Sequence, residues 1–330
     1  MVAQIDKAYA KARPRKIVTR LASYALFEGR QVTTRGRWIN PLIFALFAAE
    51  CRLPALKRVR KPAFILGIGR SGTTVLGIAL SVHREVGYLN EPKALWHFIH
   101  SHEDVMGNFT SDESRYRLDA GDASPIAVRR ARRLFGFYLA VTGSRRLVDK
   151  YPELIFRVPF VRAIFPDARF ILLLRNGSDN ISSMDAWSNR NRETTAGEVH
   201  DWWGVNGRKW RLIRDELATT DPAFTGLQDV VAGLDRQLDK VAVEWILTMR
   251  EALRQREKNS DRFFTVRYED LAARPRATLA AIADFLELEN DERFLAYGES
   301  LLRPSSGHPA PELHPRLRPL FEQTMRELGY

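Results

Sequence analysis

The sequence predicts an α/β fold in which a mainly parallel sheet is flanked by helices, with a helical extension at the N-terminus. Two observations predict it. Short, wholly apolar segments alternate with longer segments of helical periodicity, which is typical of buried parallel strands joined by helices. The first apolar segment also runs through a Gly/Ser/Thr-rich turn straight into a helix, over 64–81, FILGIGRSGTTVLGIALS. Strand, turn and helix in this order indicate a phosphate-binding loop of the P-loop type.

Composition limits the class of protein further. The chain has 330 residues and is 45% hydrophobic, enough for one large domain or two small ones. Its single cysteine, Cys51, excludes an internal disulfide framework and a cysteine-rich zinc site. The net charge of +11 resides in residues 1–61, which contain 14 Lys/Arg and 3 Asp/Glu. Because the remainder is balanced, an anion site in the body must depend on local geometry.

We therefore divide the chain into a basic helical N-terminal arm, 1–61, and an α/β domain, 62–330. The arm lacks the layout of a signal peptide, and its uncharged stretch 38–49 is shorter than the about 20 residues that span a membrane. We expect a cytoplasmic protein without a nucleic-acid partner. Two interpretations of the arm stay open: it packs on the domain with its charges solvated, or it contacts an anionic membrane or a polyanionic acceptor peripherally.

The elements follow from periodicity and from the positions of proline and glycine. We expect helices over 1–37, 41–53, 74–82, 126–141, 152–165 with a bend at Pro159, 176–184, 234–256, 275–286 and at the C-terminus. We expect strands over 63–68, 85–89, 146–149, 169–174 and 263–267. Residues 101–125 are expected to form loops, and residues 187–232 fit no single pattern.

The loop Gly67–Thr74 differs from the common ATP-binding loop. That loop reads G-x-x-x-x-G-K-[ST], whereas here no lysine follows Gly72. The buried strand FILLL is followed by Arg175, where a magnesium-dependent nucleotide hydrolase requires an acid. A cation at this point predicts an anion site that works without a metal.

Three motifs resemble those of the sulfotransferases that use 3′-phosphoadenosine 5′-phosphosulfate (PAPS): GIGRSGTT, FILLLRNGSDNISSM and RYEDL. The resemblance covers roughly 62–288 and is closest to the branch of bacterial and protein-tyrosine sulfotransferases. It implies that the 5′-phosphosulfate is bound by Arg70, Ser71, Gly72, Thr73 and Thr74. It also implies that Arg175 and Ser183 bind the 3′-phosphate and that Tyr268 lies near the adenine.

The same resemblance implies a mechanism. Glu91, in LNEP, corresponds to the base of that branch, and Lys150, in Lys-Tyr-Pro, to the cation that contacts the sulfuryl group. Arg70 adds charge at the 5′ end, PAP is the product, and no metal is expected. The acceptor would be a hydroxyl of a glycan, a lipid or a small natural product. His97 is the second choice of base, because steroid-type relatives use a histidine.

The chain departs from the family pattern at two places. Val75 stands where many members have a tryptophan that stacks on the adenine, and the Arg-Lys-Gly triplet of the cytosolic enzymes is missing. The segment 303–306, Arg-Pro-Ser-Ser, is a weak substitute for that triplet. How the adenine is held is therefore not predicted.

Simpler interpretations compete with several of these roles. Arg175 could form a structural ion pair with Asp179 or Asp185, and Ser182 could replace Ser183. Glu91 could merely begin a helix, and Lys150 could be solvated. His97, His100 and His102 lack a nearby cysteine and make a poor metal site.

The region 187–232 contains four tryptophans whose role is open. Trp187, Trp202, Trp203 and Trp210 could line an acceptor cleft or fill a helical subdomain. Two other functions also stay open for the chain as a whole. One is a magnesium-dependent nucleotide kinase or NTPase, and the other is a non-catalytic module that binds PAP or another anion.

Overall fold

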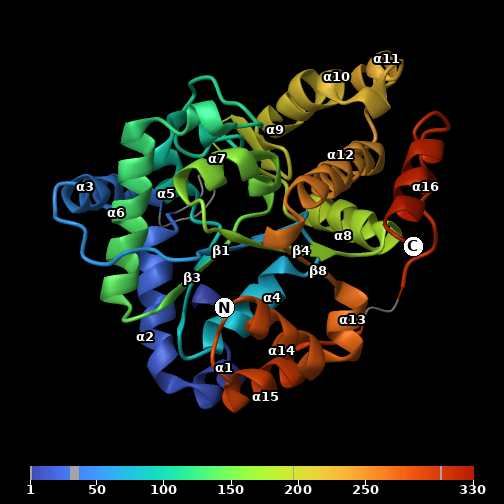
Figure 1. Ribbon diagram of the computed structural model, residues 1–330. Coiled ribbons are helices and arrows are strands. Elements are labelled where there is room, and N and C mark those ends of the chain that lie inside the picture. The colour runs from blue at the N-terminus through green and yellow to red at the C-terminus, as the bar shows by residue number, and fades with distance from the viewer. Residues whose placement is uncertain (1, 30–36, 196, 305–306) are drawn as a thin grey trace.

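The structure is a computed structural model that describes residues 2–29, 37–195, 197–304 and 307–330 (Figure 1). At its centre is a five-stranded sheet of order β2-β3-β1-β4-β8 in which every neighbouring pair is parallel. The strands are β1 (Ala63–Leu66), β2 (Val86–Asn90), β3 (Arg146–Lys150), β4 (Arg169–Leu174) and β8 (Phe263–Arg267). The predicted α/β fold with a P-loop-type parallel sheet is confirmed.

Helices cover both faces of this sheet. Along β1, Phe64 and Leu66 belong to one apolar core and Ile65 to another, as the two-residue period of a strand requires. The first core is completed by helices α5 (Lys93–Ile99), α6 (Pro125–Val141), α7 (Val158–Ile164), α8 (Gly177–Arg190) and α12 (Gln237–Lys258). The second is completed by α4 (Thr73–Val82), α14 (Pro275–Phe285) and α15 (Glu292–Leu301). Strands buried on both faces explain the continuous apolar runs in the sequence.

The helix predicted over 152–165 is not continuous. In place of a single bent helix over 152–165, the chain forms a 3-10 helix, Pro152–Arg157, followed by α7. Pro159 lies in the first turn of α7, where its missing N–H costs nothing. In the middle of a longer helix the same ring would remove a hydrogen bond and clash with the preceding turn, so the helix restarts there.

The segment that fitted no pattern contains a second, small sheet. Strands β5 (Glu193–Thr195), β6 (Glu198–Asp201) and β7 (Gly204–Val205) pair antiparallel. The short helices α9 (Arg208–Leu212), α10 (Ala218–Thr220) and α11 (Gln228–Ala232) follow them. Near the C-terminus lie α13 (Tyr268–Ala273) and α16 (Arg318–Glu327). Strands of two to four residues are too short to show a period in the sequence.

The described part of the N-terminal arm packs against the sheet. Helices α1 (Lys7–Ala12) and α2 (Pro14–Ala22) precede α3 (Asn40–Glu50). The ammonium group of Lys16 donates to the carbonyl of Val86 at 2.5 Å, and the N–H of Asn90 donates to the carboxylate of Glu28 at 2.8 Å. The arm thus covers the edge strand β2 and satisfies backbone groups at both of its ends.

Two of the arm's cations are buried, which the expectation of solvated charges did not foresee. Lys16 bonds the strand carbonyl, and Arg20 forms an ion pair with Glu28. Both therefore have partners inside the protein that replace water. Among the described residues no helix is long and apolar enough to cross a membrane.

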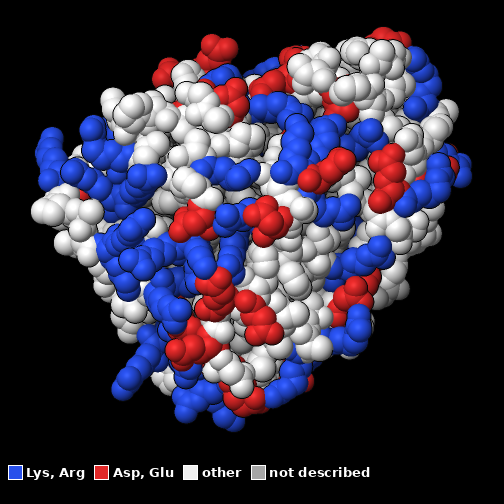
Figure 2. Space-filling view, viewed as in Figure 1, with Lys and Arg blue, Asp and Glu red and all other residues white. Residues whose placement is uncertain are grey.

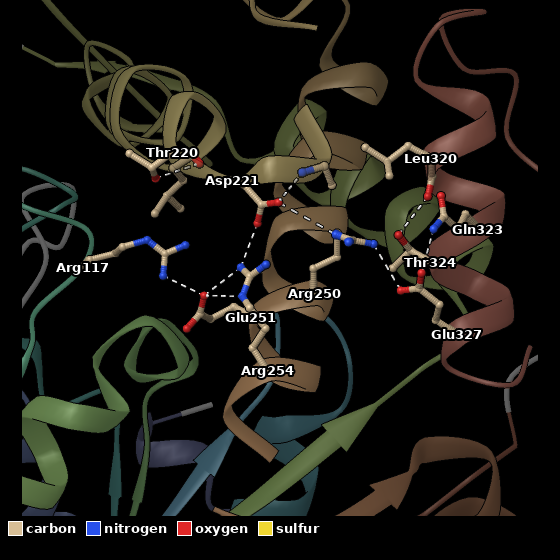
Figure 3. Close-up of polar contacts among 12 residues, drawn as sticks. Arg117, Thr220, Asp221, Arg250, Glu251, Arg254, Leu320, Gln323, Thr324 and Glu327 are labelled. Atoms are coloured by element: carbon tan, nitrogen blue, oxygen red, sulfur yellow. Dashed lines mark hydrogen bonds and ion pairs between the residues drawn. The ribbon is translucent and has the colours of Figure 1, made fainter. Parts of the chain in front are cut away.

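Helix α12 is held by a network of ion pairs that joins distant segments (Figure 3). Buried Glu251 accepts from Arg117, in the loop before α6, and from Arg254, at 2.7 and 2.8 Å. Arg254 also donates to Asp221 at 2.8 Å. The carboxylate of Asp221 in turn caps the turn after α10 by accepting from the N–H of Ala223. Arg250 reaches across to the C-terminal helix α16. The network fixes the long helix that forms one wall of the cavity described below.

Candidate active site

The predicted site residues meet at one edge of the sheet, because all five parallel strands end there. In the order of the strands across the sheet, β2 leads to Glu91, β3 ends at Lys150, β1 leads into the phosphate loop, β4 leads to Arg175 and β8 leads to Tyr268. Ligands of open α/β sheets bind outside the carboxyl ends of the strands. The structure therefore brings together side chains that are up to 198 residues apart in the chain; Arg70 and Tyr268 are an example.

The loop between β1 and α4 is a tight turn whose backbone depends on Gly72. Arg70 and Gly72 have positive φ angles of 65° and 99°. A Cβ atom on Gly72 would lie 2.4 Å from the Tyr268 ring, so only glycine fits both the angle and the space. Thr73 and Thr74 open helix α4 and line the cavity at its N-terminus, where the unpaired N–H groups favour an anion.

Ser71 has a different place from its neighbours. It is buried, and both its N–H and its hydroxyl donate to the carbonyl of Ile68, at 3.3 and 2.7 Å. Neither group points to a ligand, so Ser71 closes the turn rather than lining the cavity. Asn180 of α8 holds the other side of the loop by donating to the carbonyl of Gly69 at 3.0 Å.

Two guanidinium groups gather beside this loop. Arg175 donates to the carbonyl of Arg70 at 2.9 Å, and Arg70 donates to the hydroxyl of Ser183 at 3.4 Å. Burial, and then the charges of Arg175 and Arg190, lower the pKa of Arg70. The structure thus gathers two of the predicted anion-binding cations beside the loop.

Arg175 does form the alternative ion pair with Asp179. Its guanidinium lies 3.9 Å from the carboxylate of Asp179 and also stacks over the Tyr268 ring at 5.0 Å. Tyr268 in turn donates to the carbonyl of Arg303 at 3.0 Å. Of the weak substitute segment 303–306, Ser305 and Ser306 lie outside the described residues.

Glu91 and Lys150 form an ion pair where β2 and β3 end. Lys150 is buried, and its ammonium group bonds the carboxylate of Glu91, while the ammonium group of Lys93 lies 3.4 Å away. Burial raises the pKa of Glu91, but these two cations outweigh it and bring the pKa to about 2. Glu91 has a φ of 49° and lies before α5, whose first turn contains no acid. Lys150 is thus not solvated, and Glu91 is not part of a helix.

A cavity of about 250 Å³ opens from the phosphate loop and this ion pair. Its inner wall is a chain of opposite charges that the sequence analysis missed. Glu153 lies 3.7 Å from Lys93 and 3.9 Å from Lys209, and Lys209 lies 2.6 Å from Glu244. The one sequence signal was Glu244, a carboxylate within the apolar stretch of the α12 helix.

The four tryptophans of 187–232 divide between the two interpretations. Trp187 and Trp202 line the cavity, with ring centroids 5.4 Å apart, and Trp202 donates to Glu244 at 2.6 Å. Trp203 and Trp210 are buried against each other at 5.3 Å and belong to the core. One pair therefore forms a wall of the cavity, and the other fills the subdomain.

Of the histidines, His200 lines the cavity, whereas His97, His100 and His102 do not. His97 stacks on Phe109 at 5.5 Å, and burial lowers its pKa. It is not among the residues that line the cavity. Within the part of the chain that the structure describes, no three His, Cys, Asp or Glu side chains form a group that could hold a metal ion.

A phosphate-type loop at the carboxyl edge of a parallel sheet, with arginines where a nucleotide hydrolase has its metal-binding acid, defines an α/β protein that binds an anionic, nucleotide-like ligand. A family model places it more narrowly. The model described as the sulfotransferase family matches residues 62–222 and 211–292. The chain therefore belongs to the sulfotransferase family.

A comparison with a single curated protein matches a smaller part of the chain than the family model does. Nodulation protein NoeE of Sinorhizobium fredii (strain NBRC 101917 / NGR234) is 32% identical over 121 residues, which cover 34% of this chain and 28% of NoeE. The chain thus spans less than a third of the length of that relative.

Two solved structures are similar at low identity. A sulfotransferase domain from the curacin biosynthetic pathway is 16% identical, with a TM-score of 0.49 over 83% of this chain and 99% of that one. Sulfotransferase STF1 from Mycobacterium tuberculosis H37Rv is 17% identical, with a TM-score of 0.48 over 90% of this chain and 93% of that one.

Proposed function

We propose that this sulfotransferase transfers the sulfuryl group of PAPS to an acceptor hydroxyl, with Glu91 as the base. The observation that carries the proposal is the order of the side chains across the sheet edge. Arg175 and Tyr268 lie at one end, the phosphate loop lies in the middle, and Lys150 with Glu91 lies at the other end. A ligand with two phosphate-like groups joined by a nucleoside matches that order, with its transferable group beside Lys150.

The residues present fit such a ligand. The N-terminus of α4, with Thr73, Thr74 and Arg70, suits the 5′-phosphosulfate. Arg175 and Ser183 suit the 3′-phosphate, and two bound anions would offset the repulsion between the charges of Arg70 and Arg175. PAPS supplies the activated sulfuryl group, and the protein supplies position and charge.

The proton transfer depends on where Lys150 points. While Lys150 bonds Glu91, the carboxylate is a weak base, because its pKa is about 2. An anionic sulfuryl group beside Lys150 would draw the ammonium group toward itself and make Glu91 more basic. Glu91 then takes the proton of the acceptor hydroxyl while the hydroxyl oxygen of the acceptor forms its bond to sulfur. The bond from sulfur to the phosphate oxygen breaks, and the electron pair stays on PAP, so no metal is required.

The cavity beyond Glu91 is the place we propose for the acceptor. Most of its charged side chains are paired with one another, and its cations and carboxylates are equal in number, so it offers hydrogen bonds to hydroxyl groups without an excess cation for an anionic acceptor. Trp187 and Trp202 add an aromatic wall suited to a sugar ring or an apolar ring. Glycans, lipids and small natural products with a free hydroxyl all remain within this chemistry.

The test is a comparison of PAP, ADP and ATP–magnesium in a thermal shift experiment, followed by turnover of PAPS with a panel of acceptors. At about 100 times its Kd, PAP should add about 2.7 kcal/mol to the free energy of unfolding without magnesium. A shift that requires ATP and magnesium would instead support a kinase or NTPase. PAP binding without turnover of any acceptor would support the non-catalytic module.

A further inference from the structure

The large apolar side chains that reach solvent are gathered in one part of the chain. Among the described residues nine such side chains are exposed, and all of them lie between residues 18 and 141: Val18, Leu21, Leu26, Trp38, Leu42, Leu53, Leu56, Ile126 and Val141. The described residues from 142 onward contribute none. Scattered single exposed apolar side chains are normal, but four of these, Trp38, Leu42, Leu53 and Leu56, lie on or directly beside the one helix α3.

Helix α3 is the centre of this surface. Its inner face packs Phe44 and Phe47 on Phe98 of α5, with ring centroids 6.5 and 5.7 Å apart. Its outer side carries Leu42, 65% exposed, and Trp38 just before the helix is 77% exposed. A helix that is apolar on all sides is normally buried in a core or in lipid. Here one side of the helix, with Leu42, Ala45 and Ala49, is exposed.

Arginines lie near the C-terminal end of α3. Helix α6, which packs on α3, has four arginines and no acidic residue. Arg129, Arg130 and Arg133 lie close enough to Cys51, directly after α3, to lower the pKa that burial has raised. Arg52 and Arg58 follow on the surface. Figure 2 shows Lys and Arg gathered over the side of the molecule that α3 and α6 form, with few Asp or Glu among them.

This combination of charge and apolar surface selects one kind of partner. A second copy would place one cluster of arginines against another, at an electrostatic cost. A soluble polyanion would match the arginines but leave Trp38 and Leu42 in water. An anionic bilayer matches both, because its headgroups pair with arginine and its interface accepts tryptophan and leucine.

We infer that α3, with Trp38, Leu42, Leu53 and Leu56, lies in the interface of an anionic membrane and holds the enzyme on its surface. The helix has 11 residues and would lie along the surface, since about 20 are needed to span. Through Phe44 it contacts His97 and Phe98 of α5, the helix that follows Glu91. The bound surface is therefore one helix away from the candidate active site. This inference does not depend on the reaction that the site performs.

The experiment is flotation of the full chain with phosphatidylcholine vesicles that do or do not contain phosphatidylglycerol. The wild-type chain should float with the anionic vesicles, and Leu42→Glu should remove that binding. Arg52→Gln with Arg129→Gln should lower partitioning about fivefold for each arginine, the equivalent of about 1 kcal/mol per cation. The matched control is Arg274→Gln with Arg318→Gln, exposed arginines at α13 and α16, on the side away from α3 (Figure 1).

A second readout locates the contact. Tryptophan emission of the wild-type chain should shift to shorter wavelength on anionic vesicles. The Trp38→Phe variant should show no such shift but should still float with these vesicles. Equal thermal stability of all variants shows that they fold. The inference is overturned if the wild-type chain does not float with anionic vesicles at low ionic strength, or if the control pair loses as much binding as the test pair. It is also overturned if Leu42→Glu instead dissolves a dimer.

Discussion

Lys150 and Glu91, the last residue of β3 and the residue after β2, are ion-paired at the mouth of the cavity. The backbone N–H of Glu91 also donates to the carbonyl of Lys150, at 2.7 Å. One pair of neighbouring strands thus fixes the proposed base and the proposed sulfuryl-contacting cation relative to each other. Because the ammonium group of Lys150 is bonded to the carboxylate of Glu91, the protonation of Glu91 depends on the position of Lys150.

Glu91→Gln should lower kcat by about 10²–10⁴, the usual contribution of a general base. The amide keeps the shape of the side chain but cannot take the proton of the acceptor. Affinity for PAP should stay close to that of the wild-type chain, because Glu91 lies at the other end of the sheet edge from Arg175. Titration with PAP and turnover of PAPS measure the two effects separately.

His97→Ala is the matched comparison for this variant. His97 packs between Phe44 and Phe109 and does not line the cavity, so its loss should leave kcat within a few fold. If His97→Ala loses activity and Glu91→Gln keeps it, the assignment of the base is reversed.

Ser183→Ala should weaken PAP binding about tenfold, the value of a hydrogen bond to a charged phosphate. Ser183 already accepts a hydrogen bond from Arg70 and so lies beside the proposed 3′-phosphate site. Ser182→Ala is its neighbour on the same helix and should bind PAP as the wild-type chain does. Isothermal titration of both variants with PAP decides between the two serines. If only Ser182→Ala loses affinity for PAP, the contact with the 3′-phosphate belongs to Ser182.

Arg175→Ala should lower the affinity for PAP more than the affinity for ADP, because only PAP has the 3′-phosphate. Arg175 also supports the loop through the carbonyl of Arg70, so some thermal stability should be lost as well. The ratio of the two affinities separates these effects, since a purely structural role would lower both alike. An unchanged ratio would remove Arg175 from the 3′-phosphate site.

The strand ends made the location of the site predictable, whereas the roles of Glu91, Lys150 and Tyr268 were implied by the resemblance to the sulfotransferases. Strands such as β1 and β4 could be identified by their apolar runs, and the polar residue that follows such a run must lie at the carboxyl edge of a parallel sheet. Glu91, Lys150, Arg175 and Tyr268 all follow or end a strand in this way. Their convergence needs the topology but no knowledge of side-chain packing.

The cavity wall could not be predicted in the same way. Lys209 and Glu244 lie on helices α9 and α12, and their pairing at 2.6 Å depends on how those helices cross. Ser71 shows a second limit, because its sequence position suits a ligand contact while its hydroxyl closes the loop. Which way a side chain in a tight turn points is decided by backbone angles that the residue type alone does not determine.

Glu251→Gln should lower the free energy of unfolding by about 2 kcal/mol, the scale of hydrogen bonds to charged groups. The change removes the charge that Arg117 and Arg254 share in the network of Figure 3. Glu327→Gln removes the partner of Arg250 at the more exposed end of the same network and should cost less than about 0.5 kcal/mol. Urea unfolding of both variants measures the two changes. Equal losses in the free energy of unfolding would contradict the larger stabilising contribution assigned to Glu251.

Glu50→Gln should make stability less dependent on pH. Glu50 ends helix α3, is 3% exposed, and has no hydrogen-bond partner among the described residues for either carboxylate oxygen. Burial raises its pKa to about 8, whereas an unfolded glutamate has a pKa of about 4.3. Between these values the folded chain holds one more proton than the unfolded chain, so stability falls as pH rises, by at most about 1.4 kcal/mol per unit. Above about pH 8 this contribution levels off.

The glutamine variant has no proton to lose at this position. Its stability relative to the wild-type chain should therefore increase from pH 5 to about pH 8, and urea unfolding at several pH values measures the difference. Glu322→Gln, an exposed carboxylate paired with Arg318 on α16, serves as the control and should follow the wild-type curve. If the curves of Glu50→Gln and the wild-type chain run parallel over this range, Glu50 is ionised in the folded protein and must have a partner that neutralises it.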